Sequence, residues 1–148
     1  TQFANMYLAY ETLSDGMKAL LDGLVAVHQA DVAGYSQDPK RMVSEAELVA
    51  RVAEHPVVRT HPVTKQKALF VNEVFTKRIN ELSRSESQHL LTFLYDHVKD
   101  VNFQCRFHWQ DHSIALWDNR CTQHMAIWDY FPETRNGIRV TIQGDKPF

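Results

Sequence analysis

Hydrophobic positions near the start of the chain recur with the period of an α-helix. Asn5 is a favoured N-cap residue, and the apolar residues after it predict a short helix to about Leu13. Ser14 predicts the N-cap of a second helix, because the apolar positions that follow it share one helical face. These positions are Met17, Leu20, Leu21 and Leu24. The pattern therefore indicates two short consecutive helices.

The following segment breaks this period. Residues 29–40 contain glycine, proline and several polar residues, which predicts a loop. Ser44 and Glu47 then have the spacing of a capping box, and apolar residues as far as Val52 lie on one helical face. Pro56 cannot continue a helix, so we expect a third helix that begins at Ser44 and ends before Pro56.

A second capping box predicts a longer helix in the middle of the chain. Ser83 and Glu86 have the required spacing, and the amphipathic pattern continues to about Lys99. The apolar face carries Leu90, Leu91, Leu94 and Val98. We expect this helix to pack against the rest of the molecule through that face.

The second half of the chain contains five segments with the composition or the period of β-strands. Phe103, Cys105 and Phe107 alternate with polar residues, which predicts a strand with one buried face and places Cys105 in the core. Helices early and antiparallel strands late predict an α+β fold whose strands form a sandwich or a double-stranded helix. The five segments are 57–60, 68–72, 103–109, 113–118 and 137–143.

Composition narrows the class of protein. The chain has 148 residues with 44% hydrophobic and 23% charged residues, which is typical of one globular domain. The formal net charge of −2 leaves no basic excess for nucleic acid or an anionic membrane, and the apolar runs are too short to span a bilayer. Two cysteines cannot form a secreted disulfide framework, so we expect a cytoplasmic protein.

Histidine is the most informative residue type, with eight copies. Five lie singly at helix ends or turns, and we interpret these as solvated or packing residues. They are His28, His55, His61, His89 and His97. His108 and His112 have a gap that suits zinc, but no third ligand is spaced to complete the site.

His124 differs from the others because two arginines follow it, Arg135 and Arg139. A neutral imidazole is a good ligand for Fe(II), and a guanidinium pairs with a carboxylate through two hydrogen bonds. Such a set on neighbouring strands would hold a metal and a chelating dicarboxylate together. On spacing alone, a core histidine with two surface arginines is the more common arrangement.

Several motifs resemble the taurine dioxygenase family of Fe(II)- and 2-oxoglutarate-dependent oxygenases. The most specific is Trp-Asp-Asn-Arg-Cys-Thr-Gln-His at 117–124, and the resemblance covers essentially the whole chain. The other matching segments are 55–62, 69–73, 129–130, Arg135, 139–141 and 144–147. The resemblance implies a double-stranded β-helix (jelly roll) with flanking helices, with Fe(II) as cofactor and 2-oxoglutarate as cosubstrate.

The same resemblance implies a role for five residues. His124 corresponds to the distal histidine of the iron site. Arg135 and Thr1 correspond to residues that hold the distal carboxylate of 2-oxoglutarate. Arg139 corresponds to the arginine beside the substrate anion and the cosubstrate, so it is expected to contact both. Phe75 corresponds to an aromatic residue of the substrate pocket, with a plain core phenylalanine as the alternative.

One family motif is absent from this sequence. The iron site of the family also needs a His-x-Asp pair, and the chain contains no His-x-Asp or His-x-Glu. In the family this pair precedes the segment that Thr1 resembles. We therefore expect residues 1–148 to form the C-terminal part of a single catalytic domain, with the N-terminal part missing.

The implied reaction is hydroxylation of a small anionic substrate by O₂, with decarboxylation of 2-oxoglutarate to succinate and CO₂. A sulfonate such as taurine is the first choice, ahead of an alkyl sulfate or an aryloxyalkanoate. Two alternatives stay open: a catalytically inactive jelly-roll fragment or binding module, and an enzyme whose His-x-Asp pair lies on a partner chain. Family members commonly form homo-oligomers, but no seam in this sequence indicates an interface.

Overall fold

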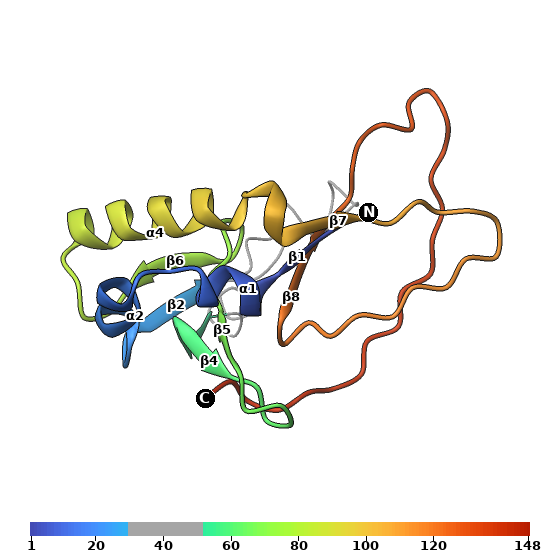
Figure 1. Cartoon of the computed structure of the whole chain (residues 1–148). Coiled ribbons are helices and arrows are strands. Elements are labelled where there is room, and N and C mark those ends of the chain that lie inside the picture. The colour runs from blue at the N-terminus through green and yellow to red at the C-terminus, as the bar shows by residue number, and fades with distance from the viewer. Residues whose placement is uncertain (30–51) are drawn as a thin grey trace.

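The structure of the protein is a computed structural model that describes residues 1–29 and 52–148 (Figure 1). Its helices are short except for α4. They are α1 (Met6–Glu11), α2 (Asp15–Leu21), α4 (Arg84–Val98) and the 3₁₀ turn η2 (Val101–Phe103). Its strands are β1 (Gln2–Asn5), β2 (Val25–Gln29), β3 (Val52–Pro56), β4 (Val58–Thr60), β5 (Lys67–Leu69), β6 (Thr76–Ile79), β7 (Gln104–Arg106) and β8 (Thr122–Met125).

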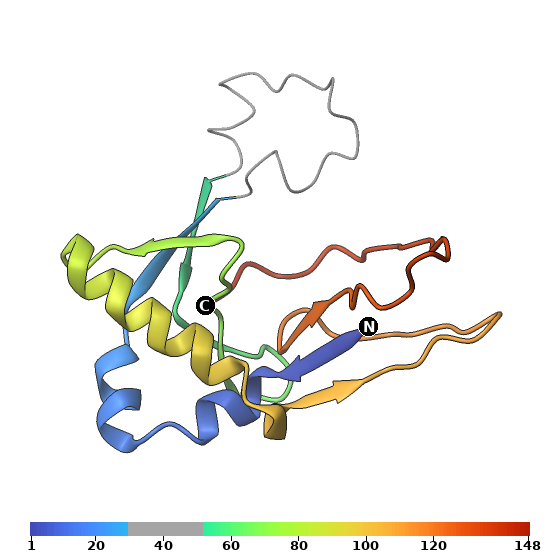
Figure 2. The ribbon, with the colours of Figure 1, turned by 90° about the horizontal axis from the view of Figure 1, so that it is seen from above.

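The strands form three small antiparallel sheets. One sheet has the order β7-β1-β8, a second has the order β3-β2-β6, and β4 pairs with β5. Helix α4 lies along β6, and the chain between β7 and β8 and the chain after β8 extend away from the rest (Figures 1 and 2). Helices together with antiparallel sheets agree with the predicted α+β class.

Local capping sequences begin the helices where the sequence predicts them. The Asn5 side chain accepts hydrogen bonds from the first turn of α1, and the Ser14 hydroxyl accepts from Met17 N in α2. Ser83 and Glu86 form the complete capping box of α4. These predictions are confirmed because a cap satisfies backbone groups of its own helix and needs no distant partner.

The hydrophobic core lies between the helices and the two small sheets beside them. Helix α1 packs against β5, and α4 packs against β6. The largest fully buried side chains are Met6, Leu21, Leu69, Ile79, Leu94, Val57 and Val71. In the two described ranges, no helix has both the length and the apolar composition needed to cross a membrane.

The predicted strands around the turn at 62–67 are present as β4 and β5, with Arg59 opposite Ala68. This hairpin places Arg59 and His61 in the interior, where they are 2% and 4% exposed. Buried polar side chains need partners. The partners of these two residues come from the second half of the chain.

The third predicted helix is wrong where it can be compared. Residues Val52–Pro56 form strand β3, which pairs with β2 through Val27 opposite Glu54. Its backbone groups are satisfied by a neighbouring strand, and this outweighs the helical period of a few apolar positions. The predicted loop at 30–40 and the predicted helix start at Ser44 lie outside the described residues.

Two predicted strands, 113–118 and 137–143, have no helix or strand in the structure. Isoleucine side chains in both segments face solvent: Ile114 is 92% exposed and Ile138 is 100% exposed. Alternation alone cannot make a strand, since each strand needs a neighbour for its backbone hydrogen bonds. None of the described residues supplies that neighbour to either segment.

The strand predicted over 103–109 is shorter than expected. Only β7, Gln104–Arg106, is paired, and Phe103 is buried at the end of η2. Cys105 is exposed and therefore does not lie in the core, contrary to the prediction. Its face of the β7-β1-β8 sheet is not covered by other described residues at that position.

Candidate functional site

The β7-β1-β8 sheet places His124 and Thr1 on the same face. His124 lies directly opposite Phe3 in the antiparallel β1–β8 pair. Directly opposed residues share a face, and every second residue of a strand returns to it. Thr1 extends this strand, because its carbonyl oxygen accepts a hydrogen bond from Phe107 N at 2.8 Å. The register therefore brings together two residues singled out from the sequence.

Two aromatic rings lie beside the His124 imidazole, which is otherwise exposed. Its ring centroid lies 4.8 Å from that of Trp117 and 6.1 Å from that of Phe3. Partial burial by these rings lowers the pKa of His124, and the charge of Arg139 lowers it further. The ring is therefore neutral at pH 7 and keeps a nitrogen lone pair with which to bind a metal ion.

The two arginines singled out from the sequence lie in 126–148, where the structure has no helix or strand. Both Arg135 and Arg139 are exposed. Arg139 lies close enough to His124 for its charge to act on the imidazole, whereas Arg135 makes no such contact. Arg139 falls within the strand predicted over 137–143, and that strand is not formed in the structure.

The Thr1 hydroxyl keeps its proton free for a ligand. Its Oγ1 accepts a hydrogen bond from Trp109 Nε1 at 2.7 Å, and its amino group donates to the Phe107 carbonyl at 3.1 Å. A hydroxyl has one donor as well as its acceptor lone pairs. Thr1 is thus able to donate to a carboxylate without losing its contact with Trp109.

Phe75 lies half-buried in a turn next to the second sheet. The Asn72 side-chain oxygen accepts hydrogen bonds from Val74 N at 2.8 Å and Phe75 N at 3.3 Å, which shapes the turn. The Asn72 amide also donates to Gln123 Oε1 at 3.3 Å. This contact ties the turn to the residue before His124, so Phe75 and His124 belong to connected parts of the molecule.

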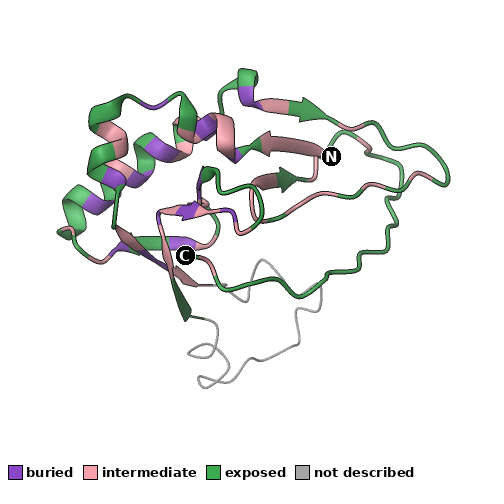
Figure 3. Cartoon of the chain, turned by 60° about the horizontal axis from the view of Figure 1, so that its bottom comes forward, coloured by how far each residue is buried: buried purple, intermediate pink, exposed green. Residues whose placement is uncertain are grey.

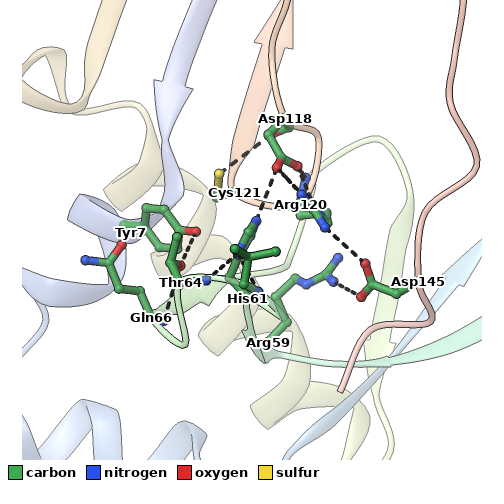
Figure 4. A network of polar contacts seen from close by, with 10 residues as sticks. Tyr7, Arg59, His61, Thr64, Gln66, Asp118, Arg120, Cys121 and Asp145 are labelled. Carbon is green, nitrogen blue, oxygen red and sulfur yellow. Dashed lines mark hydrogen bonds and ion pairs between the residues drawn. The ribbon is translucent and has the colours of Figure 1, made fainter.

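A polar network that the sequence reading missed holds the chain just before β8 (Figure 4). The Asp118 carboxylate accepts hydrogen bonds from Arg120 N at 2.8 Å and from the Arg120 guanidinium at 2.7–3.0 Å. It also accepts from His61 Nε2 at 3.2 Å. These hydrogen bonds, those of Arg120 first, hold the pKa of Asp118 well below its usual range.

The network continues to Asp145. Its carboxylate accepts from Arg59 Nη2 at 2.7 Å and from Arg120 Nη1 at 3.4 Å. The segment that carries Arg135 and Arg139 is thereby attached to β4. The sequence analysis interpreted His61 as a solitary histidine and did not predict this network. The sequence signal that could have indicated it is the Asp118-x-Arg120 spacing, which is part of the motif at 117–124.

One group of described residues has the composition of a metal site. Ligand atoms of His61, Asp118 and Cys121 lie within 4.8 Å of one another. However, His61 Nδ1 accepts hydrogen bonds from Val63 N and Thr64 N, so the proton lies on Nε2 and points at Asp118. A cation would have to displace that proton beside the charged Arg120, so we assign no metal here.

His124 is not part of any group of three metal-binding side chains among the described residues. The His-x-Asp pair that completes the iron site of the family is absent from this sequence. A complete facial site needs two more ligands.

Comparisons with known proteins point to one family. The family model described as "Taurine catabolism dioxygenase TauD, TfdA family" matches residues 1–141. A putative alpha-ketoglutarate-dependent sulfonate dioxygenase from Schizosaccharomyces pombe is 38% identical over all of this chain and 38% of the relative's length. An alpha-ketoglutarate-dependent sulfate ester dioxygenase from Pseudomonas putida is 37% identical over 99% of this chain and 51% of its own length.

Solved structures give the same result. A taurine dioxygenase from Burkholderia xenovorans superposes with a TM-score of 0.67 and 37% identity, covering 82% of this chain and 38% of that chain. AAD-2, solved with Mn(II) and N-oxalylglycine, superposes with a TM-score of 0.69 and 30% identity over 82% of this chain and 47% of its own. The 148 residues thus span about two-fifths to half of the proteins they match.

Proposed function

The chain belongs to the taurine catabolism dioxygenase TauD, TfdA family, and from this premise we propose that it works as part of a 2-oxoglutarate-dependent dioxygenase. The observation that carries the proposal is the family match over residues 1–141. The names of the relatives support it, since they are called alpha-ketoglutarate-dependent dioxygenases. Residues 1–148 are then the C-terminal part of one catalytic domain built as a jelly roll.

In this proposal His124 supplies one iron ligand. Its neutral imidazole and its place on β8 suit that role, and the rings of Trp117 and Phe3 fix its orientation. The other two ligands come from residues that are not among these 148. Fe(II) with bound 2-oxoglutarate would supply the oxidising chemistry, in which O₂ hydroxylates the substrate and 2-oxoglutarate yields succinate and CO₂.

The remaining site residues bind and orient ligands. Arg135 pairs with the distal carboxylate of 2-oxoglutarate, and the Thr1 hydroxyl donates to the same group. Arg139, whose charge already acts on His124, lies between the cosubstrate and the substrate anion. Phe75 contributes an apolar wall to the substrate pocket. Each role uses a donor or a surface that the structure leaves accessible.

We propose a small organic anion as the substrate, with a sulfonate such as taurine first. Two relatives carry the words sulfonate and sulfate ester in their names, and an arginine suits either anion. An alkyl sulfate and an aryloxyalkanoate are the alternatives, since each also presents a negative group to Arg139. Members of this set differ mainly in the apolar part that would contact Phe75.

The test of the proposal is succinate formation by the natural polypeptide that contains these residues. The assay supplies Fe(II), 2-oxoglutarate and O₂, with taurine, an alkyl sulfate or an aryloxyalkanoate as substrate. We expect one substrate to accelerate succinate release, and His124→Ala to abolish that release. His89→Ala is the matched control, because His89 is exposed on α4. Absence of activity with every substrate would favour the binding-module alternative.

A further inference from the structure

Three buried polar side-chain atoms lack a hydrogen-bond partner in the described part of the chain: His28 Nε2, His55 Nδ1 and Arg59 Nε. All three belong to side chains that gather around Phe70. The His28 and His55 ring centroids lie 5.8 Å and 5.6 Å from that of Phe70, and the Arg59 guanidinium lies 4.9 Å from it. The two imidazole centroids are 5.1 Å apart.

The strand register explains why the two histidines meet. In the β2–β3 pair, His28 lies opposite Ala53 and His55 lies opposite Ala26. The two histidines are therefore diagonal neighbours on one face of the sheet, each opposite a small alanine. Arg59 follows in β4, where it is 2% exposed. The sequence analysis treated His28 and His55 as solitary residues, whereas the structure brings them together.

Of the three unpartnered atoms, Arg59 Nε is always a hydrogen-bond donor, and His28 Nε2 is a donor in one of the two neutral tautomers. Arginine Nε always carries a proton. Thr76 Oγ1 accepts a hydrogen bond from Asn72 N at 2.8 Å and lies 3.4 Å from His28 Nδ1. When the Thr76 hydroxyl donates to His28 Nδ1, the proton of the neutral ring lies on Nε2. A guest between these side chains must therefore offer hydrogen-bond acceptors.

The charges around this cluster are mostly positive. Arg59 and Lys146 both act on His55. Asp145 is already paired with Arg59 Nη2 and Arg120, and the Glu54 carboxylate accepts from Asn80 Nδ2 at 2.8 Å. Burial, together with the neighbouring imidazole, lowers the pKa of His28 to about 4, so this ring adds no charge of its own at neutral pH. An acceptor that is also an anion is favoured in such a field.

We propose that His28, His55 and Arg59 form a binding site for a small oxyanion, that is, for a sulfate, phosphate or carboxylate group. The anion would accept from His28 Nε2 and Arg59 Nε and lie against His55 Nδ1. The site is built on β2, β3 and β4, whereas His124, Thr1 and the two arginines of the proposed catalytic site lie on or after other elements. The inference therefore stands independently of the proposed function.

The direct test follows the imidazole nitrogens of the wild-type chain by ¹H–¹⁵N NMR during titration with sodium sulfate. Sodium phosphate and sodium acetate form parallel series, and sodium chloride at matched ionic strength is the control. We expect saturable shifts of the His28 and His55 signals and a rise of about one unit or more in the pKa of His28, because an adjacent anion favours the charged ring. The exposed His89 should respond as it does to chloride.

Single substitutions test whether sulfate binds at this cluster. His28→Phe keeps an aromatic ring beside Phe70 but removes the donor, and we expect sulfate to bind about tenfold more weakly or worse. Arg59→Lys keeps a cation for Asp145 but removes Nε, and the same loss is expected. His89→Phe on α4 should leave the affinity unchanged.

The outcomes separate the possibilities without reference to activity. Saturation by any of the three anions supports the proposal, and the tightest series identifies the chemical group. Shifts no larger than those in chloride would mean that the cluster holds only water and would overturn the proposal. Saturation that is unchanged in both His28→Phe and Arg59→Lys would place the anion elsewhere and would overturn it as well.

Discussion

His61 shows how a single side chain is fixed by hydrogen bonds on both ring nitrogens. Nδ1 accepts from two backbone N–H groups of the turn after β4, and Nε2 donates to Asp118. Since each nitrogen has a defined role, the ring joins the β4–β5 turn to the chain before β8. His61 therefore holds the chain that leads into β8 against the β4–β5 turn.

At the residue scale, removing Asp118 leaves the buried His61 ring without its acceptor. We expect Asp118→Ala to lower the free energy of unfolding by about 1–3 kcal/mol. Lys99→Ala, which removes an exposed cation paired with Glu73 and Asp96, should change it far less, because water and salt screen an exposed ion pair. Urea unfolding measures both, and an equally small loss in the two variants would contradict the role given to Asp118.

The pH dependence of the free energy of unfolding is a second test of the contribution of Asp118. Because the folded-state pKa of Asp118 lies below the unfolded value of about 4, its contribution is complete above pH 4 and is lost as the pH falls below it. The free energy of unfolding should therefore decrease from about pH 4 downward. Asp118→Asn should flatten this part of the profile, and an unchanged slope would show that other carboxylates cause it.

Arg135 provides a residue-scale test of cosubstrate binding. Replacing Arg135 with alanine removes a charge-assisted hydrogen-bond pair, so we expect 2-oxoglutarate to bind about ten- to a hundredfold more weakly. Calorimetry on the natural polypeptide with Fe(II), without O₂, measures this affinity. Arg84→Ala, on the exposed first turn of α4, is the matched control. Equal affinities in the two variants would remove Arg135 from the cosubstrate site.

The candidate residues were predictable to different degrees. His124 stood out through the motif at 117–124, and its role as an iron ligand stays a prediction; the pairing of β1 with β8 places it opposite Phe3. The cluster of His28 and His55 could not be predicted, because it depends on the register of two strands that the sequence reading did not assign. Side chains far apart in sequence meet only through such pairing.

At the scale of elements, the helices follow from their caps and the strands follow from their partners. Asn5, Ser14 and Ser83 mark helix starts by contacts within the next turn. Strand β3, by contrast, lies where a helical pattern was read, since its pairing with β2 is not visible in local sequence. Local rules therefore predicted α1, α2 and α4, while β1, β2, β6 and β8 were missed.

The capping box of α4 gives an element-scale prediction. Ser83→Ala removes the hydroxyl that accepts from Glu86 N, whereas the Ser83 backbone N–H can still donate to the Glu86 carboxylate. We expect the free energy of unfolding to fall by about 1 kcal/mol. Ser85→Ala in the first turn is the control and should have little effect. If the two variants have the same stability, the box contributes nothing measurable.

At the scale of the whole molecule, the chain has a packed part and long segments outside it. Figure 3 shows buried residues on the helices and on the sheets beside them, and exposed residues along most of 126–148. The superposition on a taurine dioxygenase from Burkholderia xenovorans covers 82% of the chain. The jelly-roll architecture of the whole domain remains our proposal.

Hydrogen exchange tests this division over the entire chain. Amides of β2 and α4 have backbone partners and lie beside the core, so we expect strong protection there. Amides of 137–143 have no strand partner among the described residues and should exchange at close to unprotected rates. Strong protection of 137–143 in the isolated chain would show that this segment finds a neighbour, for example in a second copy.

The attachment of Asp145 to Arg59 and Arg120 has a further consequence for the loop that carries the two arginines. Residues 126–144 are held at one end by β8 and at the other by this ion-pair cluster, so they form a closed loop. Closing a loop restricts the volume that its residues can sample, which raises their effective concentration near both anchors. Arg135 and Arg139 thus meet an incoming anion as tethered groups rather than as parts of a free tail. Asp145→Ala would remove this attachment and lower the effective concentration of Arg135 and Arg139 near the anchors, while both guanidinium groups stay unchanged.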